Sequence, residues 1–135
     1  VQKIKRILQS VSGKKVGILG LTYKPGTDTL RRSMSLELSK ALKKLGVKVI
    51  AFDPKIKTKI KNYEFIDIKT SLEDFFQDID ITILMTEWPE FKDKQVLGYA
   101  KLMKNKVLID TKNFLENEDY KKHNFDFYRI GSNEN

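Results

Sequence analysis

The stretch from Val16 to Ser33 constrains the fold of this chain more than any other. It begins with an apolar run containing two glycines, which is typical of a buried parallel strand, and it passes through a polar loop over residues 22–29 into the start of a helix. In open α/β sheets, ligands bind beyond the carboxyl ends of the strands, where helix N-termini favour anions. Lys24 and Arg31 therefore lie where a phosphate could be held, although an arbitrary loop lysine is more often simply solvated.

Alternation of strands and helices continues along the rest of the chain. We expect strands at 15–21, 47–52, 64–68, 81–85, 106–109 and 125–130, and helices at 33–45, over about 72–79 and after Pro89. The apolar stripe expected on the first of these helices consists of Met34, Leu38, Ala41, Leu42 and Leu45. This order predicts an α/β fold: a three-layer, Rossmann-like, open and mainly parallel sheet of five to six strands with helices on both faces.

Charge and residue usage limit the classes of function. The chain has 135 residues, and 26 Lys+Arg against 18 Asp+Glu give a net charge of +8, which favours anionic partners. No aromatic-basic RNA motif or zinc-finger spacing is present, so we do not expect nucleic acid as a partner. The absence of cysteine excludes a disulfide, a thiolate metal site and a thiol nucleophile within this chain. His123 alone is too little for a histidine metal site or a catalytic triad, and we expect it at the surface.

Residues 1–12 carry apolar side chains at helical spacing and are interpreted as the end of a linker helix from an upstream region. The chain starts at Val1 without a signal peptide, and no apolar run approaches the roughly 20 residues that a membrane span needs. We therefore expect a piece of a longer cytoplasmic protein with no membrane partner.

The first strand and its loop do not match the dinucleotide-binding fingerprint. That fingerprint requires GxGxxG at the turn, whereas Gly17 and Gly20 are followed by Leu21, Thr22 and Tyr23. Asp53, after the second strand, imitates the acidic residue that holds a ribose, but capping its own turn is at least as good an explanation. Trp88, in the segment 86–91, is open to two interpretations with even odds: it anchors its loop to the core, or it belongs to a binding site.

Polar residues follow four of the expected strands. Because the carboxyl ends of parallel strands meet at one edge of the sheet, these residues are expected to converge there. They predict a polar cleft with at least two cations, suited to a phosphorylated or nucleotide ligand. The residues are Lys24, Asp53, Thr86, Glu87, Asp110 and Lys112.

Several motifs occur in the order found in one family. They are Tyr23-Lys24, Thr27-Asp28, Arg31 and Ser33 in the first loop, then Asp53-Pro54, then Thr86-Glu87-Trp88 with Phe91, then Asp110-Thr111-Lys112-Asn113, and finally Ile130-Gly131. Over residues 13–131 the chain resembles the C-terminal, UDP-binding domain of the UDP-glucose/GDP-mannose dehydrogenase family. Arg32 replaces an acidic or amide residue of the family pattern, and Lys112 replaces its arginine, which keeps the charge but loses the bidentate fork.

The resemblance implies a function for the longer protein. It would oxidise the C6 hydroxyl of a UDP-hexose to a carboxylate in two NAD-dependent steps, with UDP-glucose converted to UDP-glucuronate as the first expectation. The catalytic cysteine and the main NAD-binding fold would lie in the missing N-terminal and central domains, and the full-length protein would be a homodimer. Residues 13–135 would form the nucleotide-sugar-binding domain, which is not catalytic alone.

The resemblance also implies roles for particular residues. Tyr23, Lys24 and Lys112 would contact the UDP-sugar, and Arg31 would reach the NAD pyrophosphate. The alternatives are a dehydrogenase for UDP-N-acetylmannosamine or GDP-mannose, a non-catalytic nucleotide- or anion-binding module, and a purely structural oligomerisation domain.

Overall fold

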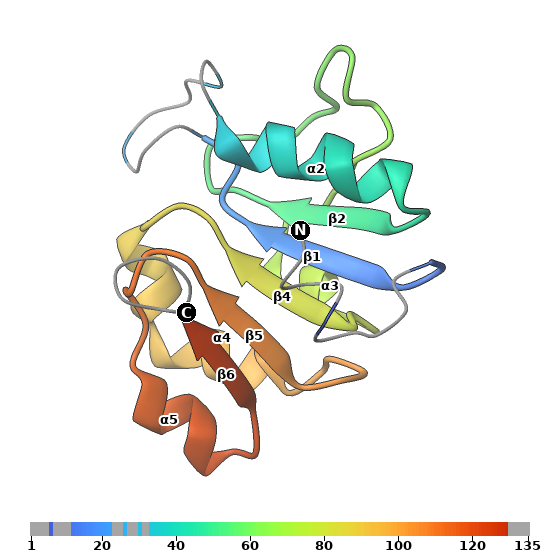
Figure 1. Ribbon diagram of the computed structural model, residues 1–135. Coiled ribbons are helices and arrows are strands. Elements are labelled where there is room, and N and C mark those ends of the chain that lie inside the picture. The colour runs from blue at the N-terminus through green and yellow to red at the C-terminus, as the bar shows by residue number, and fades with distance from the viewer. Residues whose placement is uncertain (1–5, 7–11, 23–25, 27–29, 31–32, 130–135) are drawn as a thin grey trace.

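The computed structural model describes residues 6, 12–22, 26, 30 and 33–129. Within them, six strands form one sheet in the order β3-β2-β1-β4-β5-β6, and every neighbouring pair is parallel. The chain starts at the centre of the sheet, moves out to β3, returns to β4 beside β1 and then moves out to β6 (Figure 1). The strands are β1 (Lys15–Leu19), β2 (Lys48–Phe52), β3 (Asp67–Ile68), β4 (Ile81–Leu84), β5 (Val107–Asp110) and β6 (Asp126–Arg129). This order places the topological switch point between β1 and β4.

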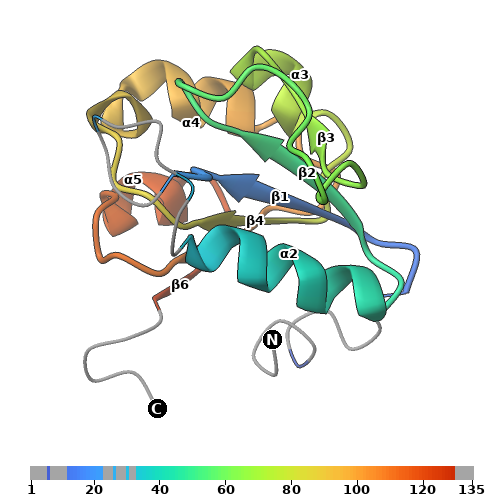
Figure 2. The same ribbon diagram turned by 90° about the horizontal axis from the view of Figure 1, so that it is seen from above.

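Helices cover both faces of the sheet, as the sequence predicted. They are α2 (Met34–Lys44), α3 (Leu72–Phe76), the 3₁₀ helix η1 (Pro89–Lys92), α4 (Lys94–Ala100) and α5 (Asn117–Lys122). Figure 2 shows α2 on one face of the sheet and α3 and α4 on the opposite face. Tyr120 of α5 belongs to the same apolar core as the buried residues of α3 and α4. The three-layer α/β architecture is therefore confirmed.

The central strands are apolar on both faces because each face meets a helical layer. Leu19 of β1 and Leu84 of β4 pack into the core under α3 and α4, whereas Ile18 and Ile83 pack into the core under α2. Gly17 leaves room for α3, since a Cβ there would lie 2.6 Å from Cζ of Phe75.

Several boundaries differ from the sequence prediction. The first strand ends at Leu19, two residues early, because Gly20 turns the chain with a φ of +99°. β3 has only two residues. The helix expected after Pro89 is split into η1 and α4, because Asp93 caps α4 by accepting a hydrogen bond from the Gln95 N–H at 3.0 Å.

The buried face of α2 was predicted wrongly in part. Met34 is 68% exposed, and the buried residues of this helix are Ser35, Leu36, Ser39 and Leu42. The serines can be buried because their hydroxyls donate to backbone carbonyls, Ser35 to Gly20 at 2.6 Å and Ser39 to Ser35 at 2.7 Å. Small side chains here also let α2 approach the loop after β1.

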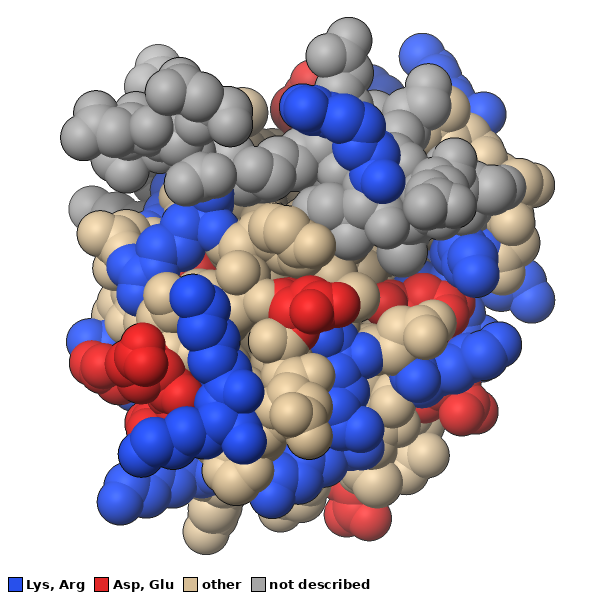
Figure 3. All heavy atoms as spheres, turned by 60° about the horizontal axis from the view of Figure 1, so that its bottom comes forward, with Lys and Arg blue, Asp and Glu red and all other residues tan. Residues whose placement is uncertain are grey.

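Charged side chains lie over the surface. On the face seen in Figure 3, basic side chains are interspersed with acidic ones rather than gathered into one field. Lysines 55, 57, 59 and 61 are all exposed, as the alternating sequence predicted, and Ile56 and Ile60 between them are half-buried. Among the described residues, no helix is long and apolar enough to cross a membrane. The linker helix predicted at 1–12 falls almost wholly outside the described residues.

Candidate functional site

Asp53 is the structural centre of the carboxyl edge of the sheet. It follows β2, is fully buried, and its Oδ2 accepts hydrogen bonds from the Leu21 N–H at 2.7 Å, the Thr22 N–H at 3.0 Å and the Thr22 hydroxyl at 3.1 Å. Its Oδ1 accepts from the Lys55 N–H at 2.8 Å. Asp53 therefore fixes both its own turn and the start of the loop that carries Lys24 and Arg31.

Trp88 joins the same network from β4. Its indole Nε1–H donates to Asp53 Oδ2 at 3.3 Å, and its side chain is 5% exposed within the core. Of the two interpretations left open by the sequence, the structure supports the anchor. The Asp-Pro and Thr-Glu-Trp motifs are thus parts of one buried assembly, a link that no local spacing in the sequence reveals.

Gly20 and Thr86 bring the loops after β1 and β4 into direct contact. A Cβ on Gly20 would lie 2.4 Å from the Thr86 Cβ and 2.8 Å from its backbone nitrogen. The Thr86 hydroxyl donates to the Thr22 carbonyl at 3.0 Å, and the Met85 N–H donates to the Leu19 carbonyl at 2.9 Å. The described parts of the two loops are therefore in direct contact at the switch point between the two central strands.

Ser33 ties the first helix to this edge. Its hydroxyl donates to the Leu21 carbonyl at 2.6 Å and accepts from the Leu36 N–H at 3.3 Å, so it is the N-cap of α2. The N-terminus of an eleven-residue helix is consequently held next to the loop after β1, which favours negative charge there.

Asp110 and Lys112 form the corresponding turn after β5. Asp110 is fully buried, and its carboxylate accepts from the backbone N–H groups of Lys112 at 2.9 Å and of Phe114 and Leu115 at 2.8 Å each. Thr111 donates to the Leu84 carbonyl at 2.6 Å, which fastens this turn to β4. The Lys112 side chain is exposed and makes no hydrogen bond or ion pair with the described residues. Lys112 is thus an exposed cation on a hydrogen-bonded turn, with no partner among the described residues.

Tyr120 lies beneath this turn. Its burial, and to a smaller extent the nearby charges of Asp110 and Asp119, raise the pKa of the Tyr120 phenol above its ordinary value. Tyr120 contacts Phe125 and Phe127 with ring centroids 5.3 and 5.6 Å away, so it is a core residue supporting the loop from below.

The predicted site residues are placed only in part. Asp53, Thr86, Asp110 and Lys112 converge on one edge, and Glu87 is half-buried beside them in the chain. Tyr23, Lys24 and Arg31 lie outside the described residues, so the predicted cleft with two cations stays a prediction. His123 is exposed at the end of α5, as expected. Among the described residues, no group of three His, Cys, Asp or Glu side chains could hold a metal ion.

The residues present do not form a dinucleotide cradle of the usual kind. The space beside Gly20, where a pyrophosphate would approach the backbone, is occupied by Thr86, and Gly17 packs on Phe75. Asp53, at the position of the ribose-binding acid, has both oxygens engaged by the protein's own donors. Among the described residues, the two glycines and the acid at the fingerprint positions are thus engaged by the protein's own groups.

Comparisons with known proteins agree with the motifs. The model of the UDP-glucose/GDP-mannose dehydrogenase family, UDP binding domain, matches residues 17–117. The UDP-glucose 6-dehydrogenase of Rickettsia felis is 38% identical over 139 residues, covering 98% of this chain and 30% of the relative. UDP-glucose 6-dehydrogenase TuaD of Bacillus subtilis is 29% identical over 97% of this chain and 29% of the relative.

Solved structures give the same answer for the fold. The UDP-N-acetyl-mannosamine dehydrogenase Cap5O of Staphylococcus aureus superposes with a TM-score of 0.72 at 25% identity, over 95% of this chain and 29% of that one. A UDP-glucose dehydrogenase of Pyrobaculum islandicum, at 22% identity and a TM-score of 0.71, shows the shared fold. The chain spans about 30% of the length of the curated relatives that it matches. It belongs to the UDP-glucose/GDP-mannose dehydrogenase family, within the UDP binding domain of that family.

Proposed function

We propose that this chain is the UDP-sugar-binding part of an NAD-dependent nucleotide-sugar dehydrogenase, which oxidises the C6 hydroxyl of a UDP-hexose to a carboxylate. One observation carries the proposal: the family's motifs, far apart in the sequence, are joined at the carboxyl edge of the sheet by the hydrogen bonds of Asp53 and Thr86, and the turn after β5 is tied to β4 by Thr111. A shared, rigid base for the loops that carry Lys24 and Lys112 is what a binding wall requires.

In this proposal the side chains on the loops hold the substrate. Lys112, exposed on its fixed turn, and Lys24 would contact the UDP-sugar as cations, with Tyr23 packing beside it. Arg31 would reach the NAD pyrophosphate. NAD supplies the acceptor for the hydride when it is bound, and because the fingerprint positions of this domain are occupied, the cofactor would be held mainly by the upstream part of the protein. The full-length protein would be a cytoplasmic homodimer.

UDP-glucose is the first substrate to test, because the curated relatives cited above are UDP-glucose 6-dehydrogenases. UDP-N-acetylmannosamine is the second, because a solved neighbour acts on it according to its name. Kinetics of the full-length protein with both sugars would decide between them.

The test of the binding role is calorimetric titration of the chain with UDP, UDP-glucose and NAD at low and moderate salt. We expect weak heat that is selective for the uridine ligands and is reduced by Lys24→Ala, while the matched control Lys101→Ala, on the exposed end of α4, leaves it unchanged. Equal heat with all three ligands, or equal loss in both variants, would contradict a UDP-specific wall.

Full-length kinetics separate the two proposed contacts. Lys24→Ala should raise the KM for the nucleotide sugar, and an unchanged KM would remove Lys24 from the site. Arg31→Ala should weaken NAD more than the sugar, and the opposite ranking would show that its partner is not the cofactor.

A further inference from the structure

A hollow lies beside β2 and includes the amino-terminal ends of the strands, away from the candidate site. It has a volume of about 480 Å³, and its lining includes Lys15 and Lys48, the first residues of β1 and β2. The candidate UDP-sugar site is placed at the carboxyl ends of the same strands, so Lys15 and Lys48 lie at the opposite ends of β1 and β2 from it.

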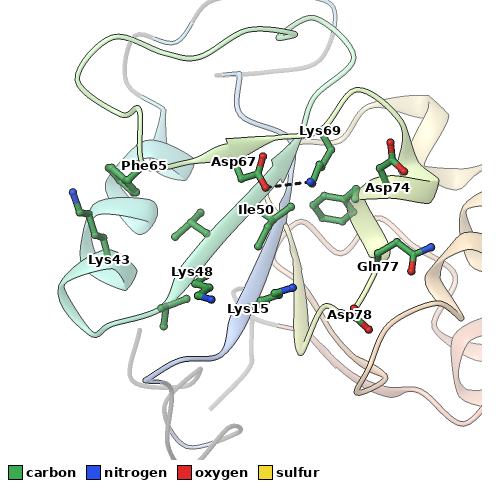
Figure 4. A pocket seen from close by; sticks show the side chains of 13 residues that line it. Lys15, Lys43, Lys48, Ile50, Phe65, Asp67, Lys69, Asp74, Gln77 and Asp78 are labelled. Carbon is green, nitrogen blue, oxygen red and sulfur yellow. Dashed lines mark ion pairs between the residues drawn. The ribbon is translucent and has the colours of Figure 1, made fainter.

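The hollow exists because β3 is short. β3 pairs only with Ile50 and Ala51 of β2, so the amino-terminal half of β2, Lys48 and Val49, has no strand beside it on that edge. Ile50 of β2 forms the apolar floor of the hollow, with α3 on one side and Phe65 on the opposite side (Figure 4). A concave, partly apolar site of this size is in the range that holds small organic ligands.

Four lysines and three aspartates line this hollow, and one of each is already paired. Asp67 is neutralised by Lys69, with the ammonium 3.1 Å from the carboxylate, and the Lys43 ammonium lies 4.6 Å from the centre of the Phe65 ring. Lys15 and Lys48 extend along the floor, and neither ammonium has a carboxylate within 4.0 Å among the described residues (Figure 4). Two unneutralised ammonium groups beside an apolar floor favour an anion that also has an apolar part.

The other two aspartates of the hollow narrow the class of ligand. Asp74 and Asp78 line it from α3 and from the turn that follows α3. A ligand with negative charge at both ends would meet these carboxylates, whereas one with a single charged head avoids them. Lysine ammonium groups bind phosphate as point charges, and two of them match the nearly double negative charge of a phosphate monoester at neutral pH.

We propose that this hollow binds a small organic phosphate monoester, its phosphate held by Lys15 and Lys48 and its apolar body lying over Ile50 and toward Phe65. The site is independent of the nucleotide-sugar site and opens a route by which a metabolite could act on the protein from the far end of the sheet.

The test is a titration of the chain with phenyl phosphate at low salt, followed by the backbone amide resonances in heteronuclear NMR spectra. We expect saturable shifts confined to the residues around Lys48–Ile50 and Asp67–Lys69, and affinity at least about threefold weaker for inorganic phosphate, which lacks the apolar part. The double variant Lys15→Gln/Lys48→Gln should lose about tenfold in affinity. The matched double variant Lys101→Gln/Lys104→Gln, two exposed lysines elsewhere, should bind like the parent.

The proposal would be overturned by no saturable shifts in this region, by equal affinity for inorganic and phenyl phosphate, or by equal losses in the two double variants. Each double variant removes two lysine charges, either in the hollow or after α4. The NMR spectra of the variants also show directly whether the chain is folded. Shifts confined to the loops after β1 and β5 would also count against it, since they would mean that the probe binds at the candidate UDP-sugar site instead.

Discussion

Replacing Asp53 should destabilise the domain more than replacing any exposed acid, although Asp53 is proposed to touch no ligand. Asp53→Ala would remove the acceptor of the buried Leu21 N–H and of the Trp88 indole N–H, together with two hydrogen bonds from Thr22. A buried donor left unpaired costs about 1–3 kcal/mol. The loss of the acceptor for Leu21 and Trp88 and of the Thr22 hydrogen bonds, partly rescued by water, gives an expected destabilisation of about 3–5 kcal/mol, a large share of the roughly 5–15 kcal/mol that stabilises a typical domain.

Asp53→Asn keeps the size and shape of the side chain and changes only its charge and hydrogen-bonding groups. Oδ2 accepts four hydrogen bonds and Oδ1 accepts one, from the Lys55 N–H. The amide oxygen can take the Oδ2 position, which sets the amide NH₂ group against the Lys55 N–H. We therefore expect a smaller loss of about 1–2 kcal/mol for this variant.

Urea unfolding followed by far-UV circular dichroism and by Trp88 fluorescence measures these losses. Trp88 is the single tryptophan of the chain, so its emission reports directly on the network around Asp53. Asp126→Ala is the control, because that exposed carboxylate makes no hydrogen bond or ion pair among the described residues, and it should change stability by less than about 0.5 kcal/mol. A loss below about 1 kcal/mol for Asp53→Ala, or a larger loss for Asn than for Ala, would refute the hydrogen-bond argument.

Three further predictions follow from the same edge of the sheet. Gly20→Ala should lower the free energy of unfolding in urea by about 3 kcal/mol, because it combines a φ of +99° with a Cβ 2.4 Å from the Thr86 Cβ. Gly98→Ala, at a position of α4 with open space for a Cβ, should raise it by about 0.5–1 kcal/mol. Because burial raises the pKa of the Tyr120 phenol, the folded state keeps this proton to a higher pH than the unfolded state does. The free energy of unfolding should therefore not depend on this group below about pH 10 and should fall above it. Tyr120→Phe should make that fall smaller in urea unfolding at a series of pH values. Lys112→Ala should weaken UDP in calorimetry by about three- to tenfold and reduce its salt dependence, and an equal effect of Lys121→Ala, on the exposed side of α5, would show that only net charge matters.

The sequence predicted the layers because the central strands β1, β2 and β4 are short, mainly apolar runs. Ile81–Leu84, for example, is buried throughout, and a nearly continuous apolar run is typical of a strand covered on both faces. Boundaries were less predictable because distant residues set them. β1 ends at Leu19 because Gly20 packs on Thr86, a residue 66 positions later, and nothing in the local sequence shows that contact.

The sequence predicted where the polar residues of this edge lie, but not which residues they contact. Topology alone places Asp53, Asp110 and Lys112 at the carboxyl ends of their strands, and the structure confirms this placement. That Asp53 binds the Trp88 indole could not be read from spacing, since the two residues lie 35 positions apart on different loops. The buried serines of α2 were missed for a related reason: a serine is apolar enough to bury only when a carbonyl such as that of Gly20 lies within reach.

This domain shares its strand order with dinucleotide-binding domains, but the contacts at its switch point differ from theirs. The difference bears on how a ligand can bind. Gly17 packs on Phe75 and Gly20 packs on Thr86. The carboxylate of Asp53, after β2, accepts hydrogen bonds from the protein's own donors. Since the described residues at these positions engage one another, we propose that a nucleotide is recognised farther out, by side chains carried on the loops. Recognition by cationic side chains more than by backbone amides should give an affinity that falls steeply with salt and responds to substitution of Lys112. Salt-insensitive binding of UDP would mean instead that the backbone of the loop after Thr22 holds the phosphates.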